Sequence, residues 1–231
     1  MKIALVGDYN EEVVAHRAIP MAIQLASKAE QIPTQVKWIS SENVVVEELA
    51  MYSAFWCVPA SPYLHMENVL QVIEYARVNN VPFLGTCGGY QHAALEYARN
   101  ALGYSEADNA ESNPNAKMPV VSGLSCKLYE VQNKIHLTAG SFVKSIYKQD
   151  QIAEEYNCGY GVNPIYLSLF DGSDLAFTGF DEDYDPKILE IKNNDFFVGT
   201  AFQPERSALA GRSHPLIRQF IKCAARLNHE R

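Results

Sequence analysis

The feature that most constrains the fold of this chain is the alternation of short apolar runs with helical patterns over its first hundred residues. Apolar runs typical of buried strands occur at residues 2–6, 36–40, 54–58 and 82–85. Apolar residues at helical spacing predict a helix from near Ile19 to Ala29, with Pro20 in its first turn, and another over residues 66–79. Strands and helices that alternate in this way form βαβ units. We therefore expect an α/β fold with a mostly parallel central sheet and helices on both faces.

The second half of the chain has a different pattern. Residues 103–117 hold almost no apolar side chain, which predicts a loop. Alternating stretches at residues 127–131, 135–137, 166–169 and 175–179 predict antiparallel strands appended to the parallel sheet. Residues 188–191 and 196–201 are expected to form a hairpin, and residues 216–227 a closing helix capped by Ser213 or His214. No repeat or linker divides the chain, so we predict a single domain over residues 1–231.

The charge and hydropathy of the chain argue against some kinds of binding partner. The 231 residues include 19 Lys+Arg and 27 Asp+Glu, for a formal net charge of −8, without a cluster of basic residues. This balance argues against nucleic acid or an anionic membrane surface as the partner. The opening MKIALVGDYN is too short an apolar run for a signal peptide, and no run approaches the ~18 residues of a spanning helix. We expect a cytoplasmic protein with a small-molecule or protein partner.

The cysteines are five in number, widely spaced and without a CxxC pair: Cys57, Cys87, Cys126, Cys158 and Cys223. This argues against a disulfide framework and against a zinc site, and we expect neither a metal nor another cofactor. Free cysteines are usually small buried hydrophobes, and this is the first interpretation of each of the five. The neighbours of Cys87 indicate a different role.

Cys87 lies in the sequence GTCGGYQ, residues 85–91, between an apolar strand and a helical run at residues 91–100. A cysteine between small residues at a strand-to-helix turn is typical of a nucleophile elbow. Glycine is needed on either side because a Cβ would collide with the neighbouring strand, and the helix N-terminus lowers the thiol pKa and offers N–H groups to an oxyanion. A tight turn around a buried cysteine is the alternative.

These motifs, in this order, resemble the class I glutamine amidotransferase family, and specifically the glutaminase domain of CTP synthase. The opening KIALVGDY resembles the family's first strand and turn, and residues 73–103 are similar to the stretch around its nucleophile. VGTAFQPE at residues 198–205 resembles the strand that ends in Phe-His-Pro-Glu, and SHPL at residues 213–216 resembles the final segment. The resemblance covers nearly the whole chain and implies a flavodoxin-like class I glutamine amidotransferase fold with a small antiparallel appendage.

The resemblance also implies a site that hydrolyses glutamine with a Cys-His-Glu triad. Cys87 matches the nucleophile and Glu205 the carboxylate that orients the histidine. The histidine position is read as Gln203, whose amide cannot accept and return a proton near neutral pH. The triad is therefore predicted to be broken. His92, five residues after Cys87, is expected to point away from the thiol, and His65 is a weak substitute.

Two further segments depart from the family's pattern. The oxyanion loop, a proline followed by two glycines, reads Pro59-Ala60-Ser61 and is followed by Pro62, although such a loop often needs the freedom of glycine. Residues 154–163 resemble a segment rich in Arg and His but contain no arginine. A glutamine α-carboxylate would lose a charge-assisted partner there, worth roughly 1.5–3 kcal/mol. Cys158 stands where that segment has a histidine, so a second thiol near the pocket is conceivable, although a packed cysteine is the ordinary interpretation.

Part of a substrate pocket persists. Gln91 and Glu111 match family positions that contact glutamine, with the glutamate facing its α-amino group, and the predicted substrate-binding set is completed by Gly88, Ala60 and Ser61. A helix-surface glutamine and a solvated loop charge are the alternatives for Gln91 and Glu111.

We therefore predict a free-standing CTP synthase-like amidotransferase homologue without the synthetase domain and without ordinary glutaminase activity. It would bind a small molecule resembling glutamine, an altered ligand, or a partner protein. The alternative is a hydrolase or transferase in which Cys87 attacks a different amide, ester or thioester. A third interpretation, a subunit that supplies ammonia to a separate synthetase, requires a base that the sequence does not provide.

Overall fold

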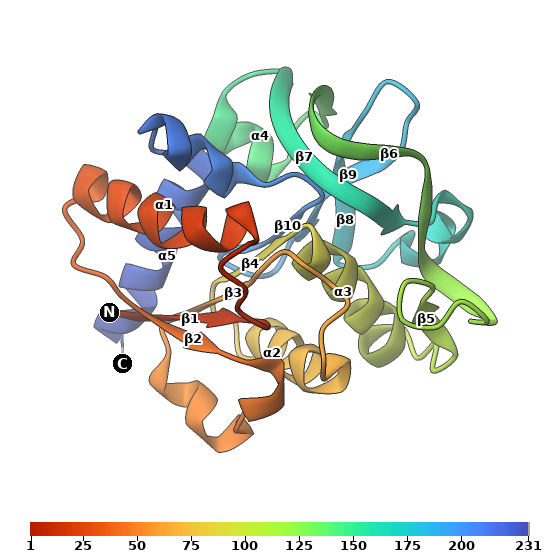
Figure 1. The fold of residues 1–231 in the computed structure, drawn as a ribbon, viewed down its shortest axis with the longest axis horizontal. Coiled ribbons are helices and arrows are strands. Elements are labelled where there is room, and N and C mark those ends of the chain that lie inside the picture. The colour runs from red at the N-terminus through yellow and green to blue at the C-terminus, as the bar shows by residue number, and fades with distance from the viewer. Residues whose placement is uncertain (231) are drawn as a thin grey trace.

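The computed structural model describes residues 1–230 and is built around a ten-stranded sheet (Figure 1). The strands follow the order β2-β1-β3-β4-β10-β9-β8-β6-β5, and β7 pairs with β6. The parallel part consists of β1 (Lys2–Val6), β2 (Gln35–Ile39), β3 (Ala54–Cys57), β4 (Phe83–Thr86) and β10 (Phe197–Thr200). The apolar runs of the first half therefore form neighbouring parallel strands, as predicted.

The remaining strands extend this sheet, mostly in antiparallel pairs. They are β5 (Ala107–Asn109), β6 (Met118–Leu137), β7 (Gln151–Val162), β8 (Leu175–Phe180) and β9 (Pro186–Ile191). β9 pairs antiparallel with both β8 and β10, which confirms the predicted hairpin. Figure 1 shows β6 and β7 as two long curved strands, in green and teal, that form an arch beside the parallel part of the sheet.

In the part of the chain that the structure describes, five α-helices cover the sheet: α1 (Val14–Glu30), α2 (Met66–Val78), α3 (Gly88–Glu96), α4 (Phe142–Tyr147) and α5 (Pro215–Glu230). Short helical turns are η1 (Ser41–Asn43), η2 (Val46–Met51), η3 (Tyr97–Ala101), η4 (Pro164–Phe170) and η5 (Pro204–Ala210). α1 packs against α5 and α2 against α3, and Figure 1 shows α1 and α2 on opposite sides of β1 and β3. The predicted α/β architecture is confirmed. Over the described residues, no helix combines the length and apolarity needed to cross a membrane.

The core explains why the central strands are continuous apolar runs. Every residue of β3 and β4 is buried, as are the last four residues of β1, because helices lie over both faces of the sheet. A strand covered on both faces cannot alternate apolar with polar side chains. Trp56 of β3 satisfies its indole N–H inside this core by donating to Thr86 Oγ1 at 3.0 Å.

Several predicted elements differ from the structure. α1 begins at Val14 rather than near Ile19, and Pro20 lies inside the helix at an exposed position, where its missing N–H costs one helical hydrogen bond. Residues 166–169 were predicted as a strand, which is wrong, because they belong to the helical turn η4. The predicted loop at residues 103–117 includes β5, and β7 was not predicted. His214 Nδ1 accepts the N–H of Leu216 at 3.2 Å, so His214 caps the closing helix as expected.

Candidate functional site

The turn at Cys87 has the backbone conformation of a nucleophile elbow. Cys87 joins β4 to α3 with φ 51° and ψ −102°, in the region that favours glycine. Its N–H donates to the carbonyl of Thr200 at 2.8 Å, which fixes the turn to the end of β10. A non-glycine residue in such a conformation costs of order 1–3 kcal/mol and is typical of functional sites. The turn therefore presents the thiol at the carboxyl ends of two neighbouring parallel strands.

The glycines around Cys87 are required by close backbone contacts. A Cβ added to Gly89 would lie 2.2 Å from the carbonyl oxygen of Cys57 on β3, and one added to Gly85 would lie 2.7 Å from the carbonyl of Gly89. Both distances are far below van der Waals contact. The predicted collision with the neighbouring strand is present for Gly89, whereas a Cβ at Gly85 would meet the start of α3.

We expect Gly89→Ala to destabilise the protein by about 3 kcal/mol or more, because the new methyl group meets backbone that cannot move without displacing β3. Gly123→Ala in β6 is the matched control, since the nearest atom to its added Cβ is 3.9 Å away. Urea denaturation of both variants measures the difference in the free energy of unfolding. Equal stabilities of the two variants would contradict the proposed packing of α3 against β3.

The thiol of Cys87 faces a second thiol. Cys87 is 5% exposed, and its Sγ lies 3.2 Å from Sγ of Cys158 on β7, to which it donates. Gln91 holds Cys158 in turn: its Nε2 donates to Cys158 Sγ at 3.2 Å and to the carbonyl of Tyr160 at 3.0 Å. The Cys158 thiol donates to the same carbonyl at 2.9 Å. The ordinary interpretation of Cys158 as a packing residue therefore misses its contact with the predicted nucleophile.

This contact shifts the pKa values of the two thiols in opposite directions. The hydrogen bond to Cys158, together with burial, raises the pKa of Cys87. The hydrogen bond that Cys158 accepts from Cys87 lowers the pKa of Cys158, as do its bonds to Tyr160 and Gln91, although burial opposes them. Cys158 is therefore the more acidic thiol of the pair, and Cys87 is not activated by its surroundings.

Glu205 is a buried carboxyl on η5 with few partners. It is fully buried, and its Oε1 accepts a long bond of 3.5 Å from Thr86 Oγ1. Its Oε2 has no hydrogen-bond partner among the residues that the structure describes. Burial raises the pKa of Glu205 to about 8, so that the carboxyl is mostly protonated near neutral pH. The side chain is placed behind the Cys87 turn but orients no base there.

Gln203 is buried at the start of η5 and belongs to a different network. Its N–H donates to the carbonyl of Glu155 on β7 at 2.9 Å. Its side-chain oxygen accepts from Arg206 Nη1 at 3.3 Å, and Arg206 Nε donates to the Glu155 carboxylate at 3.2 Å. The amide oxygen of Gln203 is therefore engaged by a guanidinium, and the arginine of this network comes from η5 rather than from the arginine-free segment of β7.

The loop at Pro59-Ala60-Ser61 lies against the start of α3. Ala60 has φ 72°, so it adopts the left-handed conformation that we expected to require glycine. A Cβ added to Gly88 would lie 3.0 Å from Ser61 Cβ and 3.1 Å from Ser61 N. The predicted residues Ala60, Ser61 and Gly88 are thus brought together at the helix N-terminus.

His16, which the sequence did not single out, supports this loop. The N–H of Asn10 donates to His16 Nδ1 at 3.0 Å, so the other ring nitrogen carries the proton and donates to the carbonyl of Pro59 at 2.9 Å. Burial lowers the pKa of His16, although these two hydrogen bonds oppose it. The neutral ring therefore acts as a fixed support between the start of α1 and the loop.

Gln91 and Glu111 also reach the site. Ser61 Oγ lies 2.6 Å from Glu111 Oε2, to which it donates, and 3.3 Å from Gln91 Oε1. Burial raises the pKa of Glu111, and the bond from Ser61 opposes the shift. Gln91 is buried rather than lying on a helix surface, and Glu111 is half-buried rather than solvated. The structure thus gathers acceptor groups beside Ser61.

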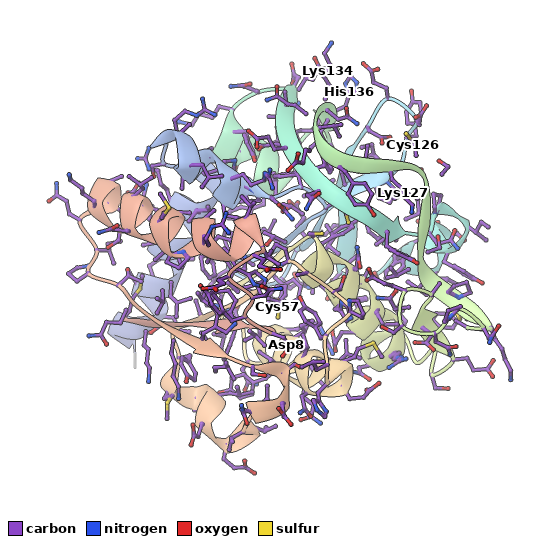
Figure 2. The ribbon with its side chains drawn as sticks, in the orientation of Figure 1. Asp8, Cys57, Cys126, Lys127, Lys134 and His136 are labelled. Carbon is purple, nitrogen blue, oxygen red and sulfur yellow. The ribbon has the colours of Figure 1, made fainter. Side chains whose placement is uncertain are left out.

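His92 and His65 lie away from the thiol. His92 Nδ1 bonds to the carbonyl of Gly88 at 2.7 Å, its ring packs on Tyr63, and burial lowers its pKa to about 4. His65 is exposed at the start of α2, where its N–H donates to Ser41. Neither ring has a recorded contact with Cys87 in the described part of the chain. Figure 2 shows the labelled Cys57 near the middle of the molecule and Cys126 out on β6.

The chain belongs to the class I glutamine amidotransferase family: the family model described as "Glutamine amidotransferase class-I" matches residues 21–223. Within the family it is similar to CTP synthases. It is 33% identical to that of Sulfolobus acidocaldarius and 31% identical to that of Saccharolobus solfataricus, over 97% and 98% of this chain. Each match covers 45% of the relative, so the chain spans less than half the length of these curated proteins.

Solved structures agree on the fold. The chain superposes on the glutaminase domain of Trypanosoma brucei CTPS, solved with bound acivicin, with a TM-score of 0.89 and 20% identity, over 98% of this chain and 94% of that one. A glutamine amidotransferase from Thermotoga maritima matches with a TM-score of 0.59 and 13% identity, over 89% of this chain and 76% of that one. The predicted class I glutamine amidotransferase fold is confirmed.

Proposed function

We propose that this chain is a CTP synthase-like glutamine amidotransferase homologue that binds a small ligand resembling glutamine, or a partner, without ordinary glutaminase activity. The observation that carries the proposal is the pairing of Cys87 with a thiol instead of an imidazole. Thiol-dependent amide hydrolysis needs a base that takes the thiol proton and returns it to the leaving ammonia. Gln203, which we assign to the histidine position of the family, cannot do this.

The electrostatics of the site support the same conclusion. The pKa of Cys87 is raised, so the thiol is neutral at physiological pH. The pKa of Glu205 is raised to about 8, so the group that would stabilise an imidazolium is itself uncharged over much of the physiological range. Ammonia release from glutamine tests the proposal, and turnover that disappears in Cys87→Ser would overturn it.

A ligand with an amino group suits the acceptors beside Ser61. Glu111 supplies a half-buried carboxyl and Gln91 a buried amide oxygen within reach of the same hydroxyl. A charged hydrogen bond of this kind is worth roughly 1.5–3 kcal/mol.

We expect L-glutamine to bind the intact protein and Glu111→Gln to weaken binding at least tenfold, which corresponds to ~1.4 kcal/mol. Glu106→Gln is the matched control, because Glu106 is exposed and pairs with Lys117 on the surface. Isothermal titration calorimetry measures both affinities. Equal losses in the two variants would contradict the assignment of Glu111 to the ligand site.

The alternative function, a Cys87 enzyme acting on another amide, ester or thioester, requires a reactive thiolate. We expect iodoacetamide to modify Cys87 slowly at pH 7, because the thiol is neutral and 5% exposed, and to modify the exposed Cys126 faster. Peptide mapping across pH 6–10 gives the rate at each cysteine. A fast rate at Cys87 with a midpoint well below about 8.5 would favour the alternative.

A further inference from the structure

The two thiols at the site are close enough to bond. Cys87 starts α3 and Cys158 lies on β7, 71 residues later, and their sulfur atoms are 3.2 Å apart. A disulfide requires an S–S distance of about 2.05 Å, so an approach of only about 1 Å separates contact from a bond. No other pair of sulfur atoms in contact is recorded among the described cysteines.

Both sulfur atoms are held in place by neighbouring groups. The backbone of Cys87 is fixed by its N–H bond to Thr200, and Cys158 Sγ is fixed by Gln91 and the carbonyl of Tyr160. Thiols positioned in this way react with each other at a high effective concentration, because no chain entropy has to be lost when they meet.

We propose that Cys87 and Cys158 form a redox-sensitive dithiol that a small hydroperoxide converts to an intramolecular disulfide. The inference does not depend on which ligand the site binds or on whether glutamine is hydrolysed. It rests on the thiol contact and on the arrangement of β7, where Cys158 lies between the exposed Asn157 and the half-buried Gly159 and Tyr160. The neighbours of Cys158 are thus more accessible than those of Cys87, although the two cysteines are equally buried, at 4% and 5% exposed.

The chemistry takes place in two steps. The Cys158 sulfur attacks one oxygen of hydrogen peroxide: an S–O bond forms, the O–O bond breaks, and the second oxygen leaves as water with the thiol proton. The Cys87 sulfur then attacks the sulfenic sulfur of Cys158; the S–S bond forms, the S–O bond breaks, and a second water leaves with the Cys87 proton. Two thiols lose two electrons and two protons, and one peroxide becomes two waters.

The first step suits Cys158 for a second reason. The bonds from Cys87 and Gln91 lower the pKa of Cys158, so its thiolate is the more populated of the two. The disulfide would tie the start of α3 to β7 and remove the free thiol from the elbow. A substrate or alkylating agent could then no longer react with Cys87 until a reductant reopened the bond.

Peptide mapping of the full chain tests the proposal. Reduced protein carrying Cys126→Ser, which removes the exposed thiol, is treated with hydrogen peroxide, denatured and alkylated. Before alkylation, we expect the oxidised protein to be about 2 Da lighter than the reduced protein. After alkylation, we expect a cross-linked Cys87–Cys158 peptide, and dithiothreitol should reverse both changes fully. Cys158→Ser and Cys87→Ser should both abolish the mass loss, whereas Cys57→Ser, which changes a buried thiol on β3, should retain it.

Three results would overturn the proposal. The first is sulfinic or sulfonic acid at Cys158 without the cross-linked peptide. The second is a mass loss of about 2 Da that persists in Cys158→Ser. The third is full alkylation of both cysteines after an exposure to peroxide that oxidises Cys126 in the unmutated chain. The peptide map of the unmutated chain decides the matter even if a variant fails to fold.

Discussion

Purified protein is expected to release ammonia from glutamine no faster than its Cys87→Ser variant. The thiol of Cys87 donates to Cys158, and the amide oxygen of Gln203 accepts from Arg206, so no described group is placed to take the thiol proton. Loss of the base from such a triad removes roughly 10³-fold or more of the rate. A coupled assay of ammonia at saturating glutamine, with an active glutaminase as the positive control, measures the difference. Wild-type turnover that Cys87→Ser abolishes would contradict the expected result.

Introducing a histidine at residue 203 is the matched gain-of-function experiment. Gln203→His introduces an imidazole two residues before Glu205, and we expect a measurable rise in ammonia release that the double variant Gln203→His, Cys87→Ser lacks. Gln203→Asn keeps an amide at the same position and should give no rise. The gain will remain below that of an active glutaminase, because Cys158 still occupies the contact with Cys87. A rise in Gln203→Asn equal to that in Gln203→His would show that the base is not its cause.

The second large effect concerns Glu205 and the stability of the fold. The pKa of Glu205 is about 8 in the folded protein, against an ordinary value of 4.5. Between these two values the unfolded chain releases this proton while the folded chain keeps it, so the free energy of unfolding falls as pH rises from about 4.5 to about 8. At ~1.4 kcal/mol for each pH unit, the loss attributable to Glu205 approaches about 5 kcal/mol. The stabilising contribution of Glu205 to the free energy of unfolding is complete below about pH 4.5 and lost above about pH 8.

Glu205→Gln removes this titration while keeping the shape of the side chain. We expect the variant to lose less stability than the wild type between pH 5 and pH 8, as measured by urea denaturation at intervals across this range. Other groups titrate in both proteins, so the difference between the two curves isolates Glu205. Parallel curves would contradict the raised pKa, and far-UV circular dichroism checks that the variant retains the fold.

The sequence predicts the parallel half of the sheet well because burial on both faces leaves a strong local signal. Residues 54–58 extend one residue past the end of β3, and residues 82–85 are displaced by one residue from β4. The strand β7 has no such signal, because the polar residues Glu154, Glu155 and Asn157 interrupt its few buried apolar residues. Only its pairing with β6 makes it a strand, and that pairing joins segments distant in sequence. Propensity also failed for residues 166–169, where Asn163 and Pro164 begin a helical turn instead.

Some features of the candidate site can likewise be predicted from the sequence, and others cannot. The elbow at Cys87 can be predicted from the local sequence, because glycine is needed where the backbone of α3 lies too close to β3 for a Cβ. The contact with Cys158 and the support of Pro59 by His16 depend on segments 71 and 43 residues away. A sequence signal for Cys158 existed, since it stands in the segment that carries histidines in the resembling family, but spacing alone does not place two thiols in contact.

The position of β7 in the sheet has a consequence for how this site can change. β7 lies off the main order of strands and pairs only with β6, yet it supplies Cys158 and the carbonyl that Gln203 contacts. The elbow, by contrast, is held by β3, β4 and β10 in the middle of the sheet. Substitutions in one peripheral strand can therefore alter what Cys87 meets without disturbing the turn that presents it. The scaffold and the chemical surroundings of Cys87 can therefore change independently.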